Sequence, residues 1–582
     1  MSMVKMGAVL REPTVWQVAA GEQALDSLAV LNDALLAARG VAPTAADFFS
    51  PRYERDVHDP HLLHGMASAV EMLYAAAAKG DRVLVHGDYD ADGITSTAII
   101  MDTLRGLGVS AAPWLPHRTD HGYGLNRSIL SDLIDSFDVL VCVDCGIAHA
   151  EEIAWLKEAG KGVIIADHHE IPAVLPPADA VLHPRHPDGA YPFGWLCGAG
   201  VSWKLAQALL RDPRSGEDGQ ATEKWLLDLV CLGTLADVVP LQGENRAVVR
   251  FGLEVLRRSR RPGIRALVAL LGETAFVDEQ TAAFRLVPLL NAAGRVDHPL
   301  AALDVLLAET PAAAQPLAEA LQRLNRRRRT LSLRVQTEAE QVVAEAAADG
   351  LPVLFAADLS WPAGVVGLVA GRLAEKYGRP AFIVGGSGES AVGSARGPAG
   401  ANVLALLQAG AAHLVRYGGH VGAAGFTVTA DNIAALQHAL LAAPSIRAAA
   451  PMRQADAVVA DSLISWETLE SLEKFAPFGE GNPKPLLILQ DVPVRDIRPV
   501  GGRGEHLKLS FEVGGRTIGG IGFGLAETAA IGIKAGGRVD VLFYLEVNVW
   551  QGQRSLQLKI EDIASAGTVD IRAAAALAII KQ

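Results

Sequence analysis

The chain has 582 residues, half of them hydrophobic, which is enough for about three or four domains with cores of their own. Asp and Glu number 65 against 52 Lys and Arg, and the net charge of −13 excludes a uniformly basic DNA-binding surface. No apolar run approaches the roughly 18 residues of a membrane span, the N-terminal residues lack a secretion signal, and four cysteines are too few for a disulfide framework. We therefore expect a monomeric cytoplasmic protein without membrane contact.

The first part of the chain alternates short apolar runs with helical patterns. Residues 1–49 are expected to form an N-terminal extension, and a domain follows over residues 50–310. Strands are predicted at residues 83–85, 110–115, 139–143 and 163–166, with helices over 95–107 and 151–159. Buried strands separated by helices predict a parallel sheet with helices on both faces, and residues 196–310 are expected to be mainly helical.

Three further segments follow this domain. Residues 311–348 contain no glycine, and no proline after Pro316, which predicts a long connecting helix, bounded at 311–350. Residues 351–455 return to an α/β pattern with many glycines and predict a second, smaller α/β domain. Residues 456–484, which include the sequence PFGEGNP, are interpreted as a linker.

Residues 485–565 change to antiparallel β patterns. Residues 506–513 alternate strictly between polar and apolar side chains, and two glycines then supply a turn. A second hairpin is predicted from residues 539–549 and 555–560, so the segment predicts a small barrel of the OB-fold type, followed by a tail over 566–582. The aromatic side chains of Phe511 and Trp550 either bind single strands or fill the barrel core.

Carboxylates and imidazoles follow three of the predicted strands. They are His86, Asp88, Asp90 and Asp92 after the first strand, Asp144 after the third, and Asp167, His168 and His169 after the fourth. Because ligands of an open parallel sheet bind outside the carboxyl ends of its strands, these groups are expected to share one crevice. So many anions would repel one another unless divalent cations compensate them.

A mixed set of His and Asp ligands suits Mn²⁺, Mg²⁺ or Zn²⁺ better than Ca²⁺. Two ions about 3.5–4 Å apart, bridged by one carboxylate, can activate a water molecule for displacement at phosphorus. Taken singly, the Asp90–Gly93 segment could be a solvated turn and the Asp167–His169 segment a helix cap. A zinc or redox interpretation of the C-x-x-C at Cys142 and Cys145 is disfavoured, because Cys142 lies within an apolar strand and no second pair follows.

These motifs resemble those of a known enzyme family. Gly87–Gly93, Val143–Gly146 and Asp167–His169 are similar to the first three motifs of the DHH phosphoesterases, and Leu235–Pro240 is similar to the fourth, in the same order. Further segments resemble the RecJ group of that family, and the resemblance covers about residues 50–563. They are Pro116–Arg118, Gly122–Gly124, Asn291–Arg295, Ser394–Arg396, Gly418–Gly425 and Pro477–Pro483, together with the barrel.

The resemblance implies a fold and a ligand set. The fold is a parallel-sheet DHH domain, a long helix, a smaller α/β DHH-associated domain and an OB-fold barrel. One metal ion, Mn²⁺ or Mg²⁺, is expected to be held by His86, Asp90 and Asp144, and the other by Asp92, Asp144, His168 and Asp237. His169 is expected to contact the scissile phosphate. Asp88 either supports the ligands or replaces His86, and the sequence does not decide between these roles.

The resemblance also implies residues that bind DNA. Ser394, Arg396 and His420 are expected to bind phosphate, because glycines let backbone N–H groups approach an anion and arginine offers a bidentate fork. Arg118, Tyr123 and Arg295 are expected to add backbone and base contacts, with Tyr123 stacking on a base. The alternative for residues 418–425 is a close-packed helix start. The arginines at 326–329 either line a channel or form a solvated helix face.

The function implied is a two-metal exonuclease that hydrolyses single-stranded DNA from its 5′ end and releases 5′-mononucleotides, in DNA recombination and repair. Single-strand-binding protein and a RecQ-like helicase are the implied partners. Two alternatives remain: a DHH enzyme acting on cyclic dinucleotides, short oligoribonucleotides or pyrophosphate, and a non-catalytic DNA-binding scaffold. The sequence fixes neither the preferred metal, nor processivity, nor the discrimination against RNA.

Overall fold

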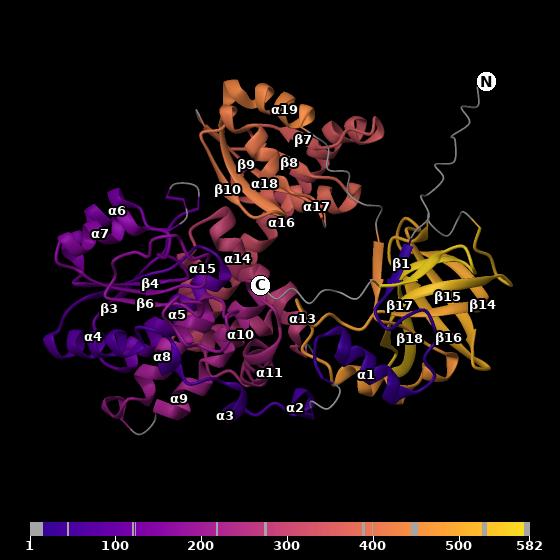
Figure 1. Ribbon diagram of the computed structural model, residues 1–582, viewed down its shortest axis with the longest axis horizontal. Helices are drawn as coiled ribbons and strands as arrows, with labels where there is room; N and C mark the ends of the chain where they lie inside the picture. The colour runs from indigo at the N-terminus through magenta and orange to yellow at the C-terminus, as the bar shows by residue number, and fades with distance from the viewer. Residues whose placement is uncertain are drawn as a thin grey trace. The chain divides into compact units, whose positions relative to one another are not determined.

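The computed structural model describes residues 15–42, 46–118, 121–122, 124–216, 219–272, 276–386, 390–398, 400–443, 452–526 and 532–574. The chain divides into two compact units (Figure 1). Residues 52–448 form one unit, called here the central unit, and residues 1–51 together with 449–582 form the other, called the barrel unit. Among the described residues, no helix is both long enough and apolar enough to cross a membrane.

The central unit begins with a five-stranded sheet whose hydrogen-bonded neighbours all run parallel, in the order β3-β2-β4-β5-β6. Its strands are β2 (Val83–His86), β3 (Ala111–Trp114), β4 (Val139–Val143), β5 (Gly162–Ala166) and β6 (Ala180–Leu182). Every residue of β2 and β4 is buried, as expected for strands covered on both faces, and this is why their sequences are continuous apolar runs. The predicted parallel sheet is confirmed, and β6 is an added strand.

Helices cover both faces of this sheet (Figure 1). They are α4 (Met66–Lys79), α5 (Ala91–Gly106), α6 (Arg127–Leu133), α7 (Ala150–Glu158) and α8 (Gly198–Arg211). Val85 and Val141 share a core with α4, α5 and α8, whereas the alternate strand residue Leu140 shares a core with α6 and α7. Because alternate residues of each strand face opposite helical layers, the carboxyl ends of the strands lie between these two layers.

The rest of this domain is helical, as predicted. Its helices are α3 (Tyr53–Asp56), α9 (Gly219–Trp225), α10 (Leu227–Ala236), α11 (Gly243–Arg257), α12 (Pro262–Ala269), α13 (Glu279–Thr281), α14 (Val287–Val296) and α15 (Leu300–Leu306). Their apolar side chains form one core with Trp203 of α8 and Ile94 of α5. Helix α5 is therefore packed against neighbouring helices as well as against the sheet.

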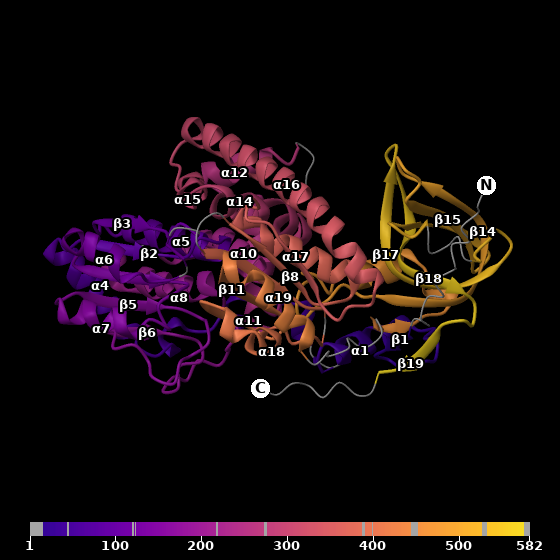
Figure 2. The same cartoon turned by 90° about the horizontal axis from the view of Figure 1, so that it is seen from above.

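A single helix, α16 (Pro311–Ala348), connects the two domains of the central unit (Figure 2). Its 38 residues span about 57 Å at the usual rise, and the hydroxyl of Thr310 accepts a hydrogen bond from the N–H of Ala313 to cap its start. Leu321 packs into the core of the first domain, and Val335 packs into the core of the second. The helix is therefore a shared structural element of both domains.

The second domain contains a mixed five-stranded sheet in the order β10-β11-β9-β8-β7. Its elements are β7 (Leu354–Ala357), α17 (Ala363–Tyr377), β8 (Ala381–Gly385), β9 (Ser390–Arg396), α18 (Val403–Ala409), β10 (Arg416–Gly419), β11 (Ala423–Thr429) and α19 (Ile433–Ala442). α16 and α17 cover one face, and α18 and α19 cover the other. Residues 418–425 lie in the β10–β11 hairpin, so the alternative of a helix start is wrong.

The barrel unit closes on itself through the ring β14-β15-β16-β18-β17, in which β17 pairs again with β14. The strands are β14 (Leu487–Val500), β15 (His506–Val513), β16 (Arg516–Gly522), β17 (Arg538–Trp550) and β18 (Gln553–Ser565). Both predicted hairpins and the OB-fold barrel are confirmed. Phe511 is fully buried in the barrel core, whereas 71% of Trp550 is exposed, so of these two aromatic residues only Trp550 is free to stack on a base.

The expected N-terminal extension, linker and C-terminal tail are parts of the same barrel unit. β1 (Val15–Val18) pairs in parallel with both β12 (Met452–Ala455) and β19 (Asp570–Ala573), and residues 456–484 contain β13 (Ala457–Val458) and α20 (Trp466–Glu473). Leu31 and Leu35 of α1 (Leu28–Ala38) lie in the barrel core, near the short helix α2 (Ala46–Phe49). Pairing between strands more than 400 residues apart leaves no local pattern, and so the sequence did not predict it.

Candidate metal centre

The carboxyl ends of β2, β4 and β5 bring the predicted ligands together. Asp90 caps α5, and its Oδ1 accepts hydrogen bonds from the N–H groups of Asp92 (3.0 Å) and Gly93 (3.1 Å). The helix therefore begins at Ala91, four residues before the predicted start, and Asp92 lies in its first turn. The N–H of Ala91 is in turn bound by the side chain of Asn291 (2.9 Å), which gives the Asn291–Arg295 segment a structural role.

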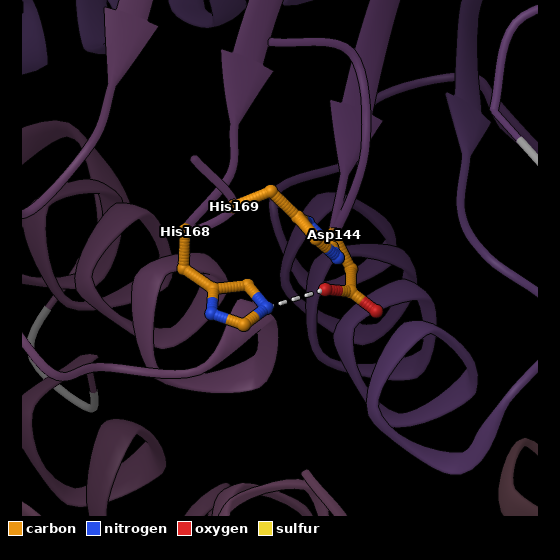
Figure 3. Close-up of side chains that lie close together, drawn as sticks. All are labelled: Asp144, His168 and His169. Carbon is orange, nitrogen blue, oxygen red and sulfur yellow. Dashed lines mark ion pairs between the residues drawn. The ribbon is translucent and has the colours of Figure 1, made fainter. Parts of the chain in front are cut away.

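Three groups of side chains could each hold a metal ion. They are Asp88, Asp90 and Asp144; Asp92, His168 and Asp237; and Asp144, His168 and His169, with the ligand atoms of each group within 4.8 Å of one another. Nε2 of His168 lies 3.2 Å from Asp144 (Figure 3). The same atom lies 3.7 Å from Asp237 and 3.9 Å from Asp92. Asp144 thus belongs to the first and third groups and lies beside His168, a member of the second, which is a position that suits a bridging carboxylate.

The structure does not place His86 in any of these groups. Its ring is buried, its Nδ1 lies 3.5 Å from Sγ of Cys145, and its ring centroid lies 4.7 Å from that of Trp114. Asp88 occupies the expected place instead, beside Asp90 and Asp144. The geometry therefore favours the alternative in which Asp88 replaces His86.

Several potential ligand atoms lack a partner, and this tests whether the residues fit metal ions. Among the described residues, Oδ1 of Asp88, Oδ1 of Asp144 and Nε2 of His168 are buried and have no hydrogen-bond partner. A buried polar atom left unpaired costs about 1–3 kcal/mol, and more when it is charged. Because carboxylate oxygens and a neutral imidazole suit Mn²⁺ and Mg²⁺, divalent ions would supply the missing partners.

The carboxylates raise one another's pKa. Burial raises the pKa of Asp144 well above its ordinary value, and the charges of Asp92 and Asp90 add to this effect. Burial and then the neighbouring Asp90 likewise raise the pKa of Asp88, and burial followed by Asp92 raises that of Asp237. Because these carboxylates must be deprotonated to bind a metal ion, metal affinity should weaken as the pH falls.

The two adjacent histidines differ in charge. Burial, and then the charge of His169, lower the pKa of His168 to about 3, so this ring is neutral and can ligate a metal ion. Burial also lowers the pKa of His169, but the hydrogen bond with Asp167 and the charge of that carboxylate outweigh it and raise the pKa to about 9. Nδ1 of His169 lies 2.7 Å from Asp167, so the cationic ring is held from that side.

The backbone around the centre is strained and crowded. Asp144 and Val238, the residue after Asp237, have φ values of 59°, a region where residues other than glycine are uncommon. The carboxylate of Asp92 accepts hydrogen bonds from the N–H groups of Gly198 (2.7 Å) and Ala199 (2.9 Å) at the start of α8. A Cβ on Gly198 would lie 2.5 Å from Cβ and Oδ1 of Asp144. Gly198 was not predicted from the sequence, because only the folded chain brings α8 to this site.

Arginines from different elements gather beside the centre. The guanidinium of Arg118 lies 4.1 Å from the ring centroid of Tyr89, and its Nε is buried without a hydrogen-bond partner among the described residues. Burial, and then the charges of Arg118 and Arg328, lower the pKa of Arg295 to about 9, while Asp90 acts in the opposite direction. Burial and Arg118 also lower the pKa of Arg396. These residues are called the arginine cluster: Arg118, Arg295, Arg328 and Arg396.

The other predicted DNA-binding residues have different positions. Ser394 is buried on β9, and its Oγ accepts a hydrogen bond from Nη1 of Arg396 (2.9 Å). His420 lies at the exposed turn of the β10–β11 hairpin, where its N–H donates to the carbonyl of Ala423 (2.8 Å). Tyr123 lies outside the described residues.

Comparison with known proteins places these features in a family. Family models match at residues 82–234 (DHH family, N-terminal domain), 350–443 (DHHA1 domain) and 455–562 (RecJ OB domain). The chain is 34% identical to the single-stranded-DNA-specific exonuclease RecJ of Bacillus subtilis, over 91% of this chain and 67% of that protein. It is 34% identical to the protein of the same name in Escherichia coli, over 86% of this chain and 90% of that protein.

Solved structures agree with this likeness. The crystal structure of RecJ in complex with Mn²⁺ from Thermus thermophilus matches with a TM-score of 0.78 and 31% identity, over 96% of this chain and 81% of that chain. A crystal structure of exonuclease RecJ bound to manganese matches with a TM-score of 0.57 and 36% identity, over 65% of this chain and 94% of that chain. Both contain the metal that suits the ligand set described above.

The substitution Gly198→Ala should weaken metal binding, because its methyl group would lie within 2.5 Å of Asp144 and push this carboxylate out of place. We expect Mn²⁺ affinity, measured by titration calorimetry, to fall by about 10-fold or more. Gly371→Ala is the matched control, since Gly371 also lies in a helix, α17, and a Cβ there meets nothing within 4 Å. Unchanged Mn²⁺ affinity in a folded Gly198→Ala protein would show that Gly198 does not position the site.

Proposed function

The chain belongs to the RecJ family of single-stranded-DNA-specific exonucleases, and on that premise we propose that it removes 5′-mononucleotides from the 5′ end of single-stranded DNA with two divalent metal ions. The main supporting observation is the pair of ligand groups beside Asp144, in which three buried ligand atoms have no hydrogen-bond partner among the described residues. Such a site is expected of a metal-dependent phosphodiesterase rather than of a non-catalytic scaffold.

We assign one ion to Asp88, Asp90 and Asp144, and the other to Asp92, Asp144, His168 and Asp237. This assignment replaces His86 by Asp88 and keeps the other expected ligands. Mn²⁺ and Mg²⁺ are the candidates, since structures of similar proteins contain them. When bound, two divalent ions that share a carboxylate activate a water molecule and stabilise the charge that develops at phosphorus.

His169 has a different role in this proposal. Its Nδ1 is bound to the buried carboxylate of Asp167, and its raised pKa keeps the ring protonated near neutral pH. Nε2 can therefore donate a charged hydrogen bond to a non-bridging oxygen of the scissile phosphate, where negative charge increases during the reaction. Asp167 orients the ring and stabilises its positive charge.

The arginine cluster is suited to the 5′ end of the strand. An internal phosphodiester has one negative charge, whereas a terminal phosphate has nearly two near neutral pH. The forked guanidinium of Arg396, with Arg118 and Arg295 close enough to act on one another's charges, would favour the more highly charged group. The hydroxyl of Ser394 accepts from Arg396, and its own hydrogen is available for the phosphate.

This arrangement explains repeated cleavage. In this proposal the terminal phosphate binds at the arginine cluster and the next phosphodiester binds at the metal centre, because Arg295 is close enough to Asp90 to be affected by its charge. Cleavage of the P–O3′ bond releases a 5′-mononucleotide and leaves a 5′-phosphate on the shortened strand. Each product strand therefore begins with the group that the cluster binds.

The barrel unit supplies a surface for the rest of the strand. Trp550 is 71% exposed at the turn between β17 and β18, a turn that binds nucleic acid in many OB-folds. Nearby, the guanidinium of Arg554 lies 5.5 Å from the ring centroid of Trp466, which is 40% exposed. Exposed tryptophans beside a cation suit stacking on bases of any sequence. Enzymes for dinucleotides or pyrophosphate would need no such surface.

We place this activity in DNA recombination and repair, in the cytoplasm. An enzyme that consumes single strands needs duplexes to be opened, and the exposed strands are coated by other proteins. A RecQ-like helicase and single-strand-binding protein are therefore the proposed partners. Every proposed ligand comes from one chain, so a monomer is sufficient for catalysis.

Replacing Asp144 by alanine should abolish hydrolysis, because this carboxylate belongs to the group with Asp88 and Asp90 and lies 3.2 Å from Nε2 of His168, a member of the other group. We expect a loss of at least about 100-fold in the rate on end-labelled single-stranded DNA with Mn²⁺, since loss of one required group normally has an effect of this size. Asp132→Ala, at an exposed carboxylate of α6, is the control and should retain the wild-type rate. If Asp144→Ala keeps more than about a tenth of the wild-type rate, the bridging assignment is wrong.

Arg396→Lys should be harmful although the charge is kept, because the planar fork is lost. The assay compares 5′-phosphorylated with 5′-hydroxyl oligonucleotides in the wild type, in Arg396→Lys and in Arg396→Ala. We expect the wild type to prefer the 5′-phosphate and both variants to lose most of that preference. Arg372→Ala, at an exposed arginine of α17, should keep the preference. If Arg396→Ala keeps it in full, another site binds the 5′ end.

Trp550→Ala should weaken binding to long single strands by about 10-fold, since stacking on one aromatic side chain contributes about 1–3 kcal/mol per base. A point substitution is preferable to deletion from residue 485, because the deletion would expose the core that holds Leu31 and Leu35. Phe284→Ala is the control, at a side chain of equal exposure (72%) in the central unit. An unchanged dissociation constant for a long oligonucleotide would remove Trp550 from DNA recognition.

A further inference from the structure

The segment that follows β6 contacts the backbone of the histidine pair. Nε2 of His183 lies 2.8 Å from the carbonyl oxygen of His169, and the His183 ring is buried with an exposure of 1%. His183 is 14 residues from His169 in sequence and belongs to none of the groups of ligand atoms among the described residues. It therefore contacts the peptide chain of the site without touching a metal ion.

The direction of this hydrogen bond follows from the other ring nitrogen. Nδ1 of His183 accepts a hydrogen bond from the N–H of Arg185 at 3.0 Å, so it carries no proton. In a neutral imidazole the proton is then on Nε2, which donates to the carbonyl of His169. Arg185 thus fixes the tautomer that His183 needs in order to hold the carbonyl.

Arg185 also contacts the neighbouring peptide group directly. Its Nη2 donates to the carbonyl oxygen of His168 at 3.3 Å. The aliphatic part of its side chain passes over Gly194, where a Cβ would lie only 3.1 Å from Cγ of Arg185. The missing side chain at position 194 leaves the space through which Arg185 reaches the histidine pair.

Asp167 holds the same short segment through its N–H groups. Its Oδ1 accepts hydrogen bonds from the N–H of His168 (2.7 Å) and of His169 (3.2 Å), and its Oδ2 accepts from the N–H of Ile147 (3.0 Å). The N–H groups of both histidines are thus bound by Asp167, and their carbonyls are bound by Arg185 and His183. Four hydrogen bonds fix the backbone from which both imidazoles project.

We propose that His183 and Arg185 are positioning residues of the nuclease, which hold the carbonyls of His169 and His168 so that one imidazole points at the carboxylates and the other at the scissile phosphate. The inference rests on the proposed function of the site. Its physical basis is that small displacements of the imidazole have large effects on the rate. Nε2 of His168 lies 3.2–3.9 Å from three carboxylates, and a displacement of about 1 Å can reduce a rate by about 100-fold.

The test measures Mn²⁺ affinity by calorimetry, and kcat and KM on single-stranded DNA, in His183→Ala and His183→Gln. For His183→Ala we expect Mn²⁺ affinity and kcat to fall by about 10–100-fold, while KM changes by less than about threefold. His183→Gln should recover most of both, because the glutamine amide N–H₂ can replace Nε2 as the donor to the carbonyl. A residue that only stabilised the fold would lower the melting temperature without this separation of kcat from KM.

His186→Ala is the matched control. His186 is buried in the same segment, and its ring stacks on that of His64 at 4.0 Å, so its loss disturbs the segment without removing a contact to the histidine pair. We expect His186→Ala to keep Mn²⁺ affinity and kcat within about twofold of the wild-type values. Arg185→Lys should stay closer to the wild-type values than Arg185→Ala. If His183→Ala fails to fold, Arg185→Ala is the variant to measure in its place, because the Arg185 side chain is exposed.

Two results would overturn the inference. One is a folded His183→Ala protein, or a folded Arg185→Ala protein where the first is unstable, with wild-type Mn²⁺ affinity and kcat. The other is an equal loss in His186→Ala. Failure of the proposed function looks different, because the wild type itself would then show no Mn²⁺-dependent hydrolysis of single-stranded DNA.

Discussion

Mutual repulsion of buried carboxylates is the constraint on which the rest of the central unit depends. Asp88, Asp92 and Asp144 are almost fully buried within reach of one another, and each has its pKa raised by burial and by a neighbouring carboxylate. Nothing in such a cluster favours folding by itself, and it persists only where the surrounding structure determines it. The parallel sheet, its helical layers and the N-terminus of α8 supply that structure, and divalent cations supply the opposite charge.

The same constraint accounts for the charge distribution of the site. The chain as a whole is acidic, so it gains no general attraction for DNA. The arginine cluster provides local positive charge beside the acidic centre, and Arg295 is influenced by Arg118, by Arg328 and, with opposite sign, by Asp90. Arg328 lies on α16, which packs into the cores of both domains, so the arginine cluster combines residues of both domains and of the helix between them.

The sequence was sufficient wherever local chemistry determines structure. Continuous apolar runs revealed the parallel strands, and alternation at residues 506–513 revealed a barrel hairpin. The sequence was insufficient where contacts between residues far apart in the chain determine the structure. The family resemblance implied His86 as a ligand and left Asp88 as its alternative, whereas the folded chain places the His86 ring beside Cys145 and Asp88 beside Asp144. Gly198 and His183 have no recognisable pattern, because their importance comes only from the groups that the fold brings against them.

The proposed metal centre depends on one point, that Asp144 joins two metal ions. Titration of the full chain with Mn²⁺, followed by calorimetry and by electron paramagnetic resonance, tests it most directly. We expect two Mn²⁺ ions per chain with the spectrum of a magnetically coupled pair, as for ions about 3.5–4 Å apart. A single bound ion at saturation, or two ions with uncoupled spectra, would contradict it.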